Sequence, residues 1–162
     1  MTPELHRPVR IERIGPGGLT VDVVPTPAER EALAERMQIP AIEALSCRFT
    51  LRPGPSDTFL ATGELTARIV QTCVVTLDDF EASVTEPFTV RFVPAGTESE
   101  EVDLEGEDEI PYENETLDVG EAAAEQLALS LDPYPRKPGA ELPEDAQAES
   151  LNPFETLRNR LQ

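Results

Sequence analysis

An α+β fold is predicted for this chain, with a curved, mostly antiparallel β-sheet, or a partly closed barrel, and two main helices. Residues 42–93 alternate apolar and polar side chains with the period of two that half-buried strands require. Residues 26–37 and 118–131 instead begin with capping residues and carry apolar residues at helical spacing. A chain of 162 residues is near the size of one domain. We therefore expect a single α+β domain over residues 1–138.

The N-terminal part predicts a hairpin and then a helix. Two extended stretches within residues 9–24 flank the turn signal Gly15-Pro16-Gly17-Gly18, which favours a β-hairpin. Thr26 can cap a helix, Pro27 suits its first position, and Glu29 completes a capping box. The helix is expected to end near Met37, before Pro40.

Three long strands follow, and their alternation assigns an inward side to each. The expected inward residues are Leu45, Cys47, Phe49 and Leu51 in the first strand and Phe59, Ala61, Gly63, Leu65, Ala67 and Ile69 in the second. Cys73, Val75 and Leu77 continue that parity, so the second stretch reaches about 19 residues against a usual 5–6. A bend or bulge is therefore expected near Gln71.

The third strand is expected to turn Phe80, Ala82, Val84, Phe88, Val90 and Phe92 inward. Pro87 cannot donate to a strand ladder, so it indicates an edge or a bulge. Residues 95–116 are rich in acids, poor in apolar groups and without a period, which predicts a disordered acidic loop. A helix capped by Asp118 should then pack on the sheet. Residues 139–162 are expected to form a mostly flexible tail, in which Asn152-Pro153 can start a short helix.

The net charge of −19 is concentrated in one part of the chain. Residues 1–91 hold nine Arg against thirteen Asp and Glu, whereas residues 92–135 hold fourteen acids and no Lys or Arg. The acidic segment comprises Glu98, Glu100, Glu101, Asp103, Glu105, Glu107, Asp108 and Glu109. It is either a solvated linker or a docking surface for a basic partner.

No constellation of residues indicates an enzyme, a metal site or a cofactor. The one histidine, His6, lies near the terminus, which leaves no basis for a nucleophilic triad. Two cysteines and one distant histidine do not supply four zinc ligands, and Cys47 and Cys73 are expected to be buried free thiols. No apolar run of about 18 residues or secretory signal is present, which predicts a cytoplasmic protein without a membrane partner. No small-molecule substrate is expected either.

Arginine is the main candidate for a binding role, because twelve of the thirteen cations are Arg. Arg48, Arg52, Arg68 and Arg91 all fall on the side opposite the predicted core face. If the strands are neighbours, these residues form a basic stripe suited to bidentate contact with phosphate or carboxylate. The alternative is that they pair across strands with Glu64, Glu81 and Glu86 or with the acidic loop.

Three sequence features in order resemble the YceD family, the large ribosomal RNA subunit accumulation proteins, in their alphaproteobacterial form. The first is Val24-Pro25-Thr26-Pro27-Ala28-Glu29-Arg30. The second joins residues 71–77 (QTCVVTL) to Glu86-Pro87-Phe88 and Arg91-Phe92-Val93-Pro94. The third joins residues 117–121 (LDVGE) to residues 124–135 (AEQLALSLDPYP). Many members carry Cys-x-x-Cys where this chain has residues 73–76 (CVVT), so a metal site is not carried over.

The resemblance implies a non-catalytic ribosome-biogenesis factor that supports accumulation or processing of large-subunit (23S) ribosomal RNA. The implied partners are large-subunit rRNA or a pre-ribosomal particle, with basic ribosomal proteins as further candidates. An acidic adaptor that engages a basic partner, such as a ribosomal protein or a nuclease, without contacting RNA is the alternative hypothesis.

Overall fold

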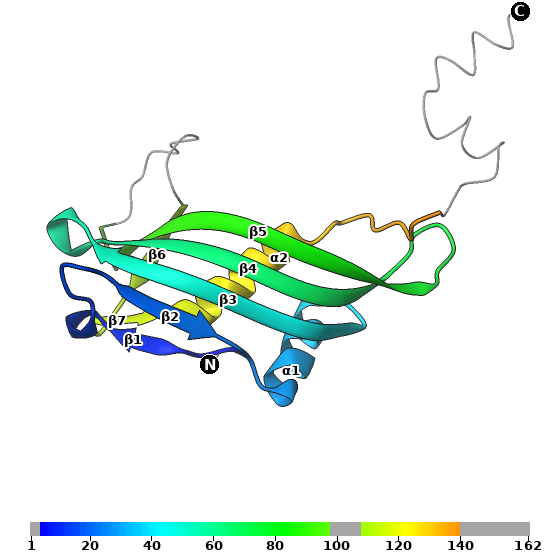
Figure 1. Ribbon diagram of the computed structural model, residues 1–162, viewed down its shortest axis with the longest axis horizontal. Coiled ribbons are helices and arrows are strands. Elements are labelled where there is room, and N and C mark those ends of the chain that lie inside the picture. Colours follow the sequence, from blue (N-terminus) through cyan, green and yellow to red (C-terminus); the bar gives the residue numbers. More distant parts are fainter. Residues whose placement is uncertain (1–3, 98–107, 140–162) are drawn as a thin grey trace, which may run out of the picture.

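The computed structural model describes residues 4–97 and 108–139. Its main element is a five-stranded sheet in the order β2-β3-β4-β5-β6, beside a two-stranded sheet of β1 and β7 (Figure 1). All neighbouring strands are antiparallel except β5 and β6. The strands are β1 Pro8–Arg10, β2 Leu19–Val23, β3 Ala41–Pro53, β4 Phe59–Thr72, β5 Asp79–Pro94, β6 Asp108–Tyr112 and β7 Thr116–Asp118. The helices are α1 Pro27–Met37, α2 Val119–Ser130 and the short 3-10 turns Ile11–Arg13 and Pro55–Asp57. The predicted α+β class is confirmed.

The three long strands bury one face of the sheet as their alternation predicted. In β3 and β4 the predicted inward residues are buried, and their neighbours in sequence are exposed or half-buried. In β5 only Val90 and Phe92 of the predicted inward set are fully buried, while Phe80, Ala82, Val84 and Phe88 are half-buried. Side chains are therefore fully buried along the middle of the inner face and only half-buried beneath most of β5.

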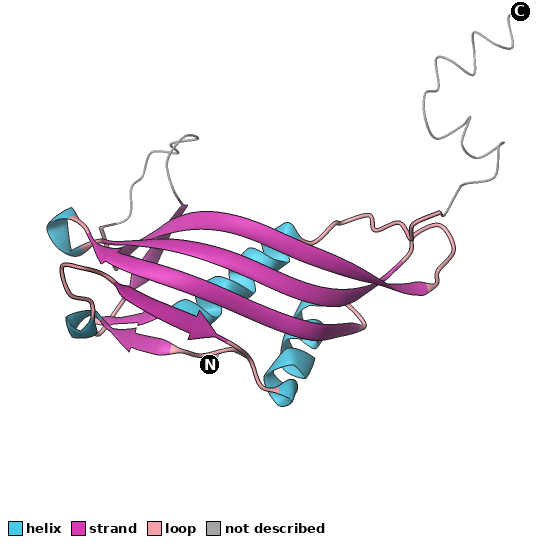
Figure 2. Cartoon of the chain, in the orientation of Figure 1, coloured by secondary structure: helices cyan, strands magenta, loops and turns pink. Residues whose placement is uncertain are grey.

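Helix α2 supplies the cover over the inner face, and Figure 2 shows it crossing behind the strands. Asp118 caps it by accepting hydrogen bonds from the backbone N–H groups of Gly120 and Glu121, at 3.1 and 3.2 Å. Its buried residues are Val119, Gly120, Ala122, Ala123, Ala124 and Leu127. The helix packs against β4, β2 and β5, and Gly120 allows a close approach of the backbone at Leu5 and Arg7. The predicted packing helix is confirmed.

Helix α1 has the predicted beginning and end. The Thr26 side chain accepts from the Glu29 N–H, and the Glu29 carboxylate accepts from the Thr26 N–H, so the capping box is complete. The helix ends at Met37, where Gln38 adopts a left-handed conformation. Leu33 and Ala34 are its buried residues, which places α1 against the end of β3.

The predicted hairpin over residues 9–24 is wrong. Strand β1 pairs with β7, which joins Val9 to Leu117, and β2 pairs with β3, which joins Val21 to Phe49. The glycine-rich turn and the preceding 3-10 turn separate the two strands instead of pairing them. Local turn residues mark where the chain reverses, but the buried faces available elsewhere decide which strand becomes the partner.

The predicted bend near Gln71 is also wrong. Strand β4 pairs with β5 in unbroken register from Phe59 to Thr72 and then stops. Leu77 lies in the following turn with a φ of 63° and is 76% exposed. Gln71 remains buried, because its amide nitrogen donates to the Asp132 carbonyl at 3.3 Å. A hydrogen-bond partner distant in sequence, rather than a bulge, satisfies this buried polar group.

The acidic loop expected over residues 95–116 needs a partial correction. Residues 108–112 form β6, which adds in parallel to residues 90–94, and Tyr112 is buried with its hydroxyl bonded to the Asp57 carbonyl. Residues 98–107 and the tail from residue 140 lie outside the described residues, so their disorder stays a prediction. Among the described strands, β4 is the only neighbour of β5 at Pro87, which confirms the predicted edge there.

Candidate nucleic-acid interface

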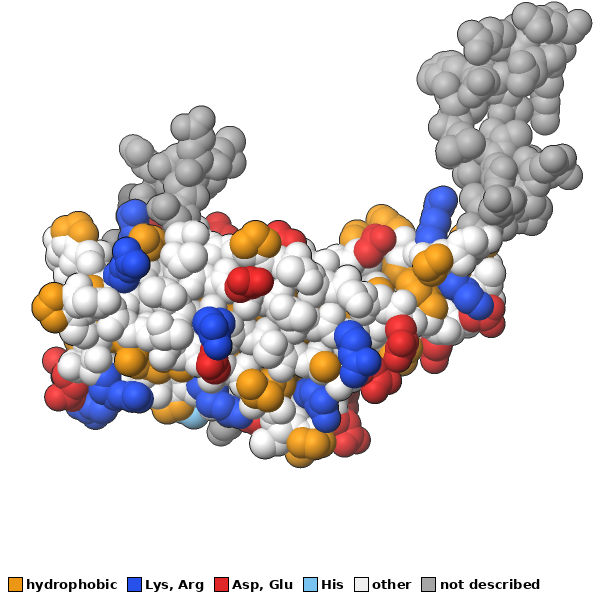
Figure 3. Space-filling view, in the orientation of Figure 1, with side chains coloured by type: hydrophobic (Ala, Val, Ile, Leu, Met, Phe, Trp, Pro, Cys, Tyr) orange, Lys and Arg blue, Asp and Glu red, His pale blue; other side chains and the backbone are white. Residues whose placement is uncertain are grey.

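The outer face of the sheet, formed by β3, β4 and β5, is polar and is not covered by any described helix. Its side chains alternate with those of the core, and most are hydroxyl residues or arginines. The hydroxyl residues are Ser46, Thr50, Thr62, Thr66, Thr72, Ser83, Thr85 and Thr89. Figure 3 views this face and shows a mostly uncharged surface with separate basic and acidic groups. Such a face contributes little to the core and is free to serve as a contact surface.

All four predicted arginines lie on this face, and all are exposed. Arg52 and Arg91 flank Leu60 in one row across β3, β4 and β5. Arg48 lies two rows away, and Arg68 lies eight residues along β4 from Leu60. At about 3.3 Å per residue, the set spans roughly 26 Å. The arginines therefore share a face but form spaced contacts rather than a continuous stripe.

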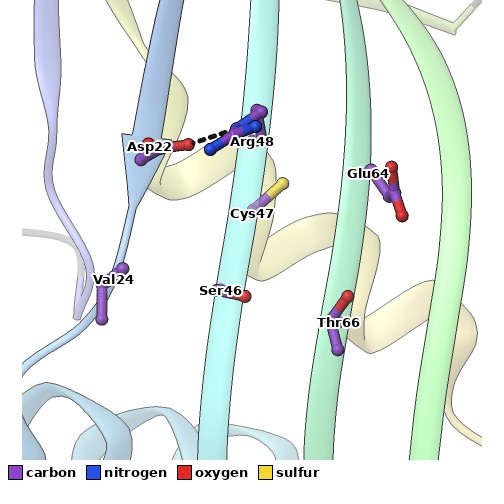
Figure 4. Close-up of a pocket in the computed structure, with 7 residues that line it drawn as sticks. All are labelled: Asp22, Val24, Ser46, Cys47, Arg48, Glu64 and Thr66. Atoms are coloured by element: carbon purple, nitrogen blue, oxygen red, sulfur yellow. Dashed lines mark hydrogen bonds and ion pairs between the residues drawn. The ribbon is translucent and has the colours of Figure 1, made fainter.

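Arg48 is already engaged within the sheet. Its Nε donates to Asp22 Oδ1 at 2.8 Å, across the register that joins β2 to β3 (Figure 4). This hydrogen bond lowers the pKa of Asp22 and raises that of Arg48. Both side chains are more than half exposed, so water and salt weaken the ion pair. An incoming phosphate can compete for this guanidinium.

The carboxylates around Arg48 match the predicted partners in part. Asp22 was not among those partners, because the predicted hairpin paired residues 9–24 with each other. Glu64 lies opposite Arg48 on β4, and both line a shallow depression of about 350 Å³ with Asp22. Glu86 lies opposite Leu65, on the inner side of the sheet, so it does not belong to this face. The alternation of Thr20 and Asp22 with Val21 and Val23 places Asp22 on a polar face, but no sequence signal shows that this strand pairs with β3.

Arginines away from the outer face hold the helices and the N-terminal segment together. Arg7 donates to both carboxylate oxygens of Glu29, at 2.6 and 2.7 Å, and lowers the pKa of Glu29 to about 2, with help from the Thr26 N–H. Arg36 donates to Glu4 and to both oxygens of Glu121, which links α1 to α2. These bidentate pairs have a structural role.

Of the predicted acidic segment, only Asp108 and Glu109 lie within the described residues. Both belong to β6 at the border of the sheet, Asp108 exposed and Glu109 half-buried. Glu98, Glu100, Glu101, Asp103, Glu105 and Glu107 lie outside the described residues, so their role as a partner surface stays a prediction.

The two cysteines are free and buried, as predicted, but they differ chemically. Cys47 faces the core, and burial raises its pKa to about 12. Burial also raises the pKa of Cys73, but the N–H groups of Lys137, Thr76 and Val75 outweigh it and lower the pKa to about 7. The Cys73 sulfur accepts from Lys137 N at 3.3 Å and from Thr76 N at 3.4 Å.

The described residues contain neither a cluster of metal ligands nor a membrane-spanning helix. Across residues 4–97 and 108–139, no group of three or more His, Cys, Asp or Glu is placed to hold a metal ion. Within the same ranges, no helix is long and apolar enough to cross a membrane.

Comparison with known proteins identifies a family. Residues 61–159 match the family model described as large ribosomal RNA subunit accumulation protein YceD. No curated protein and no solved structure matches this chain. The matched region starts in β4, includes β5, β6, β7 and α2, and covers more than half of the sequence. The chain therefore belongs to the YceD family.

Proposed function

We propose that this chain is a non-catalytic ribosome-biogenesis factor that supports accumulation or processing of large-subunit (23S) ribosomal RNA in the cytoplasm. Membership of a family named for large ribosomal RNA subunit accumulation supports the process. Direct RNA contact is supported by one observation, the outer face of the sheet that no described helix covers. On this face Arg48, Arg52, Arg68 and Arg91 are exposed. The proposal includes the alphaproteobacterial type, for which residues 24–30 are the support.

The outer face favours contact with the RNA backbone rather than with stacked bases. Among the described strands β3, β4 and β5, no Phe or Tyr points to this side. Single-stranded RNA is usually held by aromatic stacking, whereas folded RNA is recognised through phosphates and 2′-hydroxyls. Spaced guanidinium groups with hydroxyls between them suit the second mode. The proposed ligand is therefore a structured part of large-subunit rRNA.

Substitution of matched arginine pairs tests this interface. The Arg52→Gln, Arg68→Gln variant removes two outer-face cations that have no ion-pair partner among the described residues. Affinity for transcribed 23S rRNA domains should fall, and the slope of log affinity against log salt should decrease by about 1.5–2. The Arg10→Gln, Arg13→Gln variant makes the same charge change elsewhere. Equal losses in both variants would show non-specific attraction and remove the outer face from the proposal.

A cellular measurement tests the process. Tagged protein should enrich large-subunit rRNA and pre-ribosomal proteins from a lysate. Finding neither above background would contradict the ribosomal role.

The acidic adaptor remains a second candidate, because the outer face is electrically balanced. Its four arginines are matched by Asp22, Glu64, Asp79 and Glu81. An adaptor would engage a basic protein, and its partners would survive ribonuclease treatment of the lysate. Loss of partners after ribonuclease treatment favours direct RNA contact.

A further inference from the structure

We propose that the free edge of β5, residues 79–89, binds an extended, Lys/Arg-rich segment of a partner polypeptide as an additional strand. This goes beyond the RNA contact, because it uses the border of the sheet rather than its outer face and a protein rather than a nucleic acid. Figure 1 shows β5 along one border of the sheet.

The edge is long and its pairing is incomplete. Strand β6 pairs only with residues 90–94, and β4 is the only described strand that pairs with residues 79–89. Eleven residues at about 3.3 Å each leave roughly 36 Å of strand edge. Because β6 already adds in parallel to the same border, its geometry is suited to an added strand.

The register identifies the backbone groups that point outward. Just beyond the last ladder pair, Thr72 and Asp79, the Cys73 N–H donates to the Asp78 carbonyl, which sets the alternation of the β4–β5 ladder. Hydrogen-bonded and non-hydrogen-bonded pairs alternate along an antiparallel ladder. The N–H groups of Glu81, Ser83 and Thr85 therefore face away from β4. Pro87 has the same parity, so its missing N–H does not cost the ladder a bond.

The opposite border of the sheet is protected, which makes the open edge of β5 distinctive. There β2 has only five residues, and the part of β3 that extends beyond it packs against α1. The β3 register is irregular between Ile42 and Ala44, and Arg30 donates to the Glu43 carbonyl at 2.6 Å. Short strands, bulges and helical covers are the usual means of blocking an edge. Within the described residues, no helix or bulge blocks residues 79–89 of β5, and the only such features on this edge are exposed carboxylates and Pro87.

The negative charge along the edge of β5 favours a basic peptide segment as the ligand. Asp79, Glu81 and Glu86 are exposed along the edge, and residues 79–89 contain no Lys or Arg. Cations close to this edge are Arg91 on β5 itself, Arg68, opposite Ser83 on β4, and Lys137, 3.9 Å from Asp78. Residues 92–135, which supply β6, β7 and α2, add acids but no cation. A basic strand would meet three carboxylates along the edge, and complementary charge favours encounter with it.

The side chains on the inner side of β5 favour a ligand that also carries apolar residues. Phe80, Ala82 and Val84 are half-buried, because the inner face is less fully covered here than beneath β4. An added strand with apolar residues at alternate positions would extend this row. The expected ligand therefore alternates cations with β-branched residues.

Amide hydrogen exchange of the full chain tests whether the edge is open. The N–H groups of Glu81, Ser83 and Thr85 should exchange quickly, while those of Phe80 and Ala82, which are bonded to β4, should exchange slowly. Slow exchange at all five positions in the free protein would overturn the proposal. Light scattering would then identify the occupant as a second copy if the protein is a dimer, or as the chain itself if it is a monomer.

Binding of a defined peptide tests the occupant. The probe is an eleven-residue peptide of alternating Lys and Val, and the same peptide with Glu in place of Lys is the control. The Lys peptide should bind and slow exchange at Glu81, Ser83 and Thr85. Binding of both peptides with equal affinity, or of neither, would contradict the proposal.

Two edge variants separate strand addition from general attraction. Thr85→Pro removes one outward donor without removing a bond to β4, and Glu81→Lys with Glu86→Lys reverses the edge charge. Each should weaken binding by about ten-fold or more, with an unchanged circular dichroism spectrum. Glu31→Lys with Glu35→Lys makes the same charge change on exposed positions of α1 and should bind like wild type. Binding that survives both edge variants would overturn the proposal.

Discussion

The two faces of one sheet differ in composition, and the difference separates stability from contact. The inner face carries Leu, Ile and Phe side chains buried beneath α2, where Leu65 and Ile69 have at most 1% of their surface exposed. The outer face carries threonines and arginines that only solvent covers in the described structure. Inner-face substitutions should therefore change folding, and outer-face substitutions should change binding.

The largest expected contrast is between the reactivities of the two cysteines with thiol reagents. It tests where the fully buried part of the inner face ends. Cys47 lies under the cover of α2, whereas Cys73 lies beyond the end of β4, beneath residues 132–137. With pKa values of about 12 and about 7, Cys73 should be mostly thiolate at pH 8 and Cys47 should not. Cys73 has no exposed surface, so thiol reagents reach its thiolate only when residues 132–137 open, and they should still modify it faster than Cys47.

Peptide mapping and substitution check this contrast. Cys73→Ser should abolish the fast phase and Cys47→Ser should not. The rate should rise with pH, pass half of its maximum near pH 7, where half of the Cys73 is thiolate, and level off about one to two pH units higher. Equal rates for the two cysteines in the folded protein would show that the inner face is not buried as described.

Two leucines of α2, one buried and one exposed, test how much the packing of this helix on the inner face contributes to the free energy of unfolding. Leu127 is fully buried, and Leu129, two residues later, is 72% exposed. Leu127→Ala should lower the free energy of unfolding by about 2–5 kcal/mol, because it leaves a cavity. Leu129→Ala should change it by less than about 0.5 kcal/mol. Urea unfolding measures both, and similar losses would contradict the assigned orientation of the helix.

Adjacent residues on β4 test the two faces directly. A Cβ atom on Gly63 would lie 2.2 Å from the Phe88 ring, so Gly63→Ala must displace that ring. The expected cost is about 1–3 kcal/mol. Thr62 points to the outer face, and Thr62→Ala should stay within about 0.5 kcal/mol of wild type. A larger loss at Thr62 would indicate that the outer face is packed.

A pH dependence tests the ion pair between Arg7 and Glu29, which lies away from the outer face. Hydrogen bonding by Arg7 holds the pKa of Glu29 at about 2, below its ordinary value of 4.5. A lowered carboxyl pKa contributes stability above pH 4.5, and this contribution is lost as the pH falls from 4.5 to 2. Glu29→Gln should therefore flatten the stability profile across that window.

Glu64→Gln is the matched control for Glu29, because Glu64 lies on the outer face. Urea unfolding midpoints measured between pH 7 and pH 2 give both profiles. If the profile of Glu29→Gln follows that of wild type, Arg7 and Glu29 do not stabilise this side of the fold.

The sequence predicted local order better than long-range partners. Period-two alternation assigned the faces of Leu45 and Leu65 correctly, because one-sided burial constrains each strand separately. The capping box at Thr26 likewise depends on neighbouring residues alone. The hairpin prediction failed because turn residues do not reveal that Val9 pairs with Leu117, and the partner of Arg48 was missed for the same reason.

Strand β6 escaped prediction for a different physical reason. Residues 108–112 have almost no apolar alternation of their own, and their order comes from pairing with residues 90–94 and from burial of Tyr112. Tertiary pairing can order a segment whose composition favours disorder. Pro87 indicated an edge or a bulge, but how far the free edge of β5 extends could not be predicted, since strand order cannot be read from one sequence.

Crosslinking in cells, followed by sequencing of the attached RNA, tests the central claim most directly. The account predicts that the full chain crosslinks to defined, base-paired regions of 23S rRNA through peptides of β3, β4 and β5. The Arg52→Gln, Arg68→Gln variant should lose most of this signal at wild-type abundance. Crosslinks that are absent, that are spread evenly over cellular RNA, or that persist unchanged in the variant would contradict a role for the outer face in binding large-subunit rRNA.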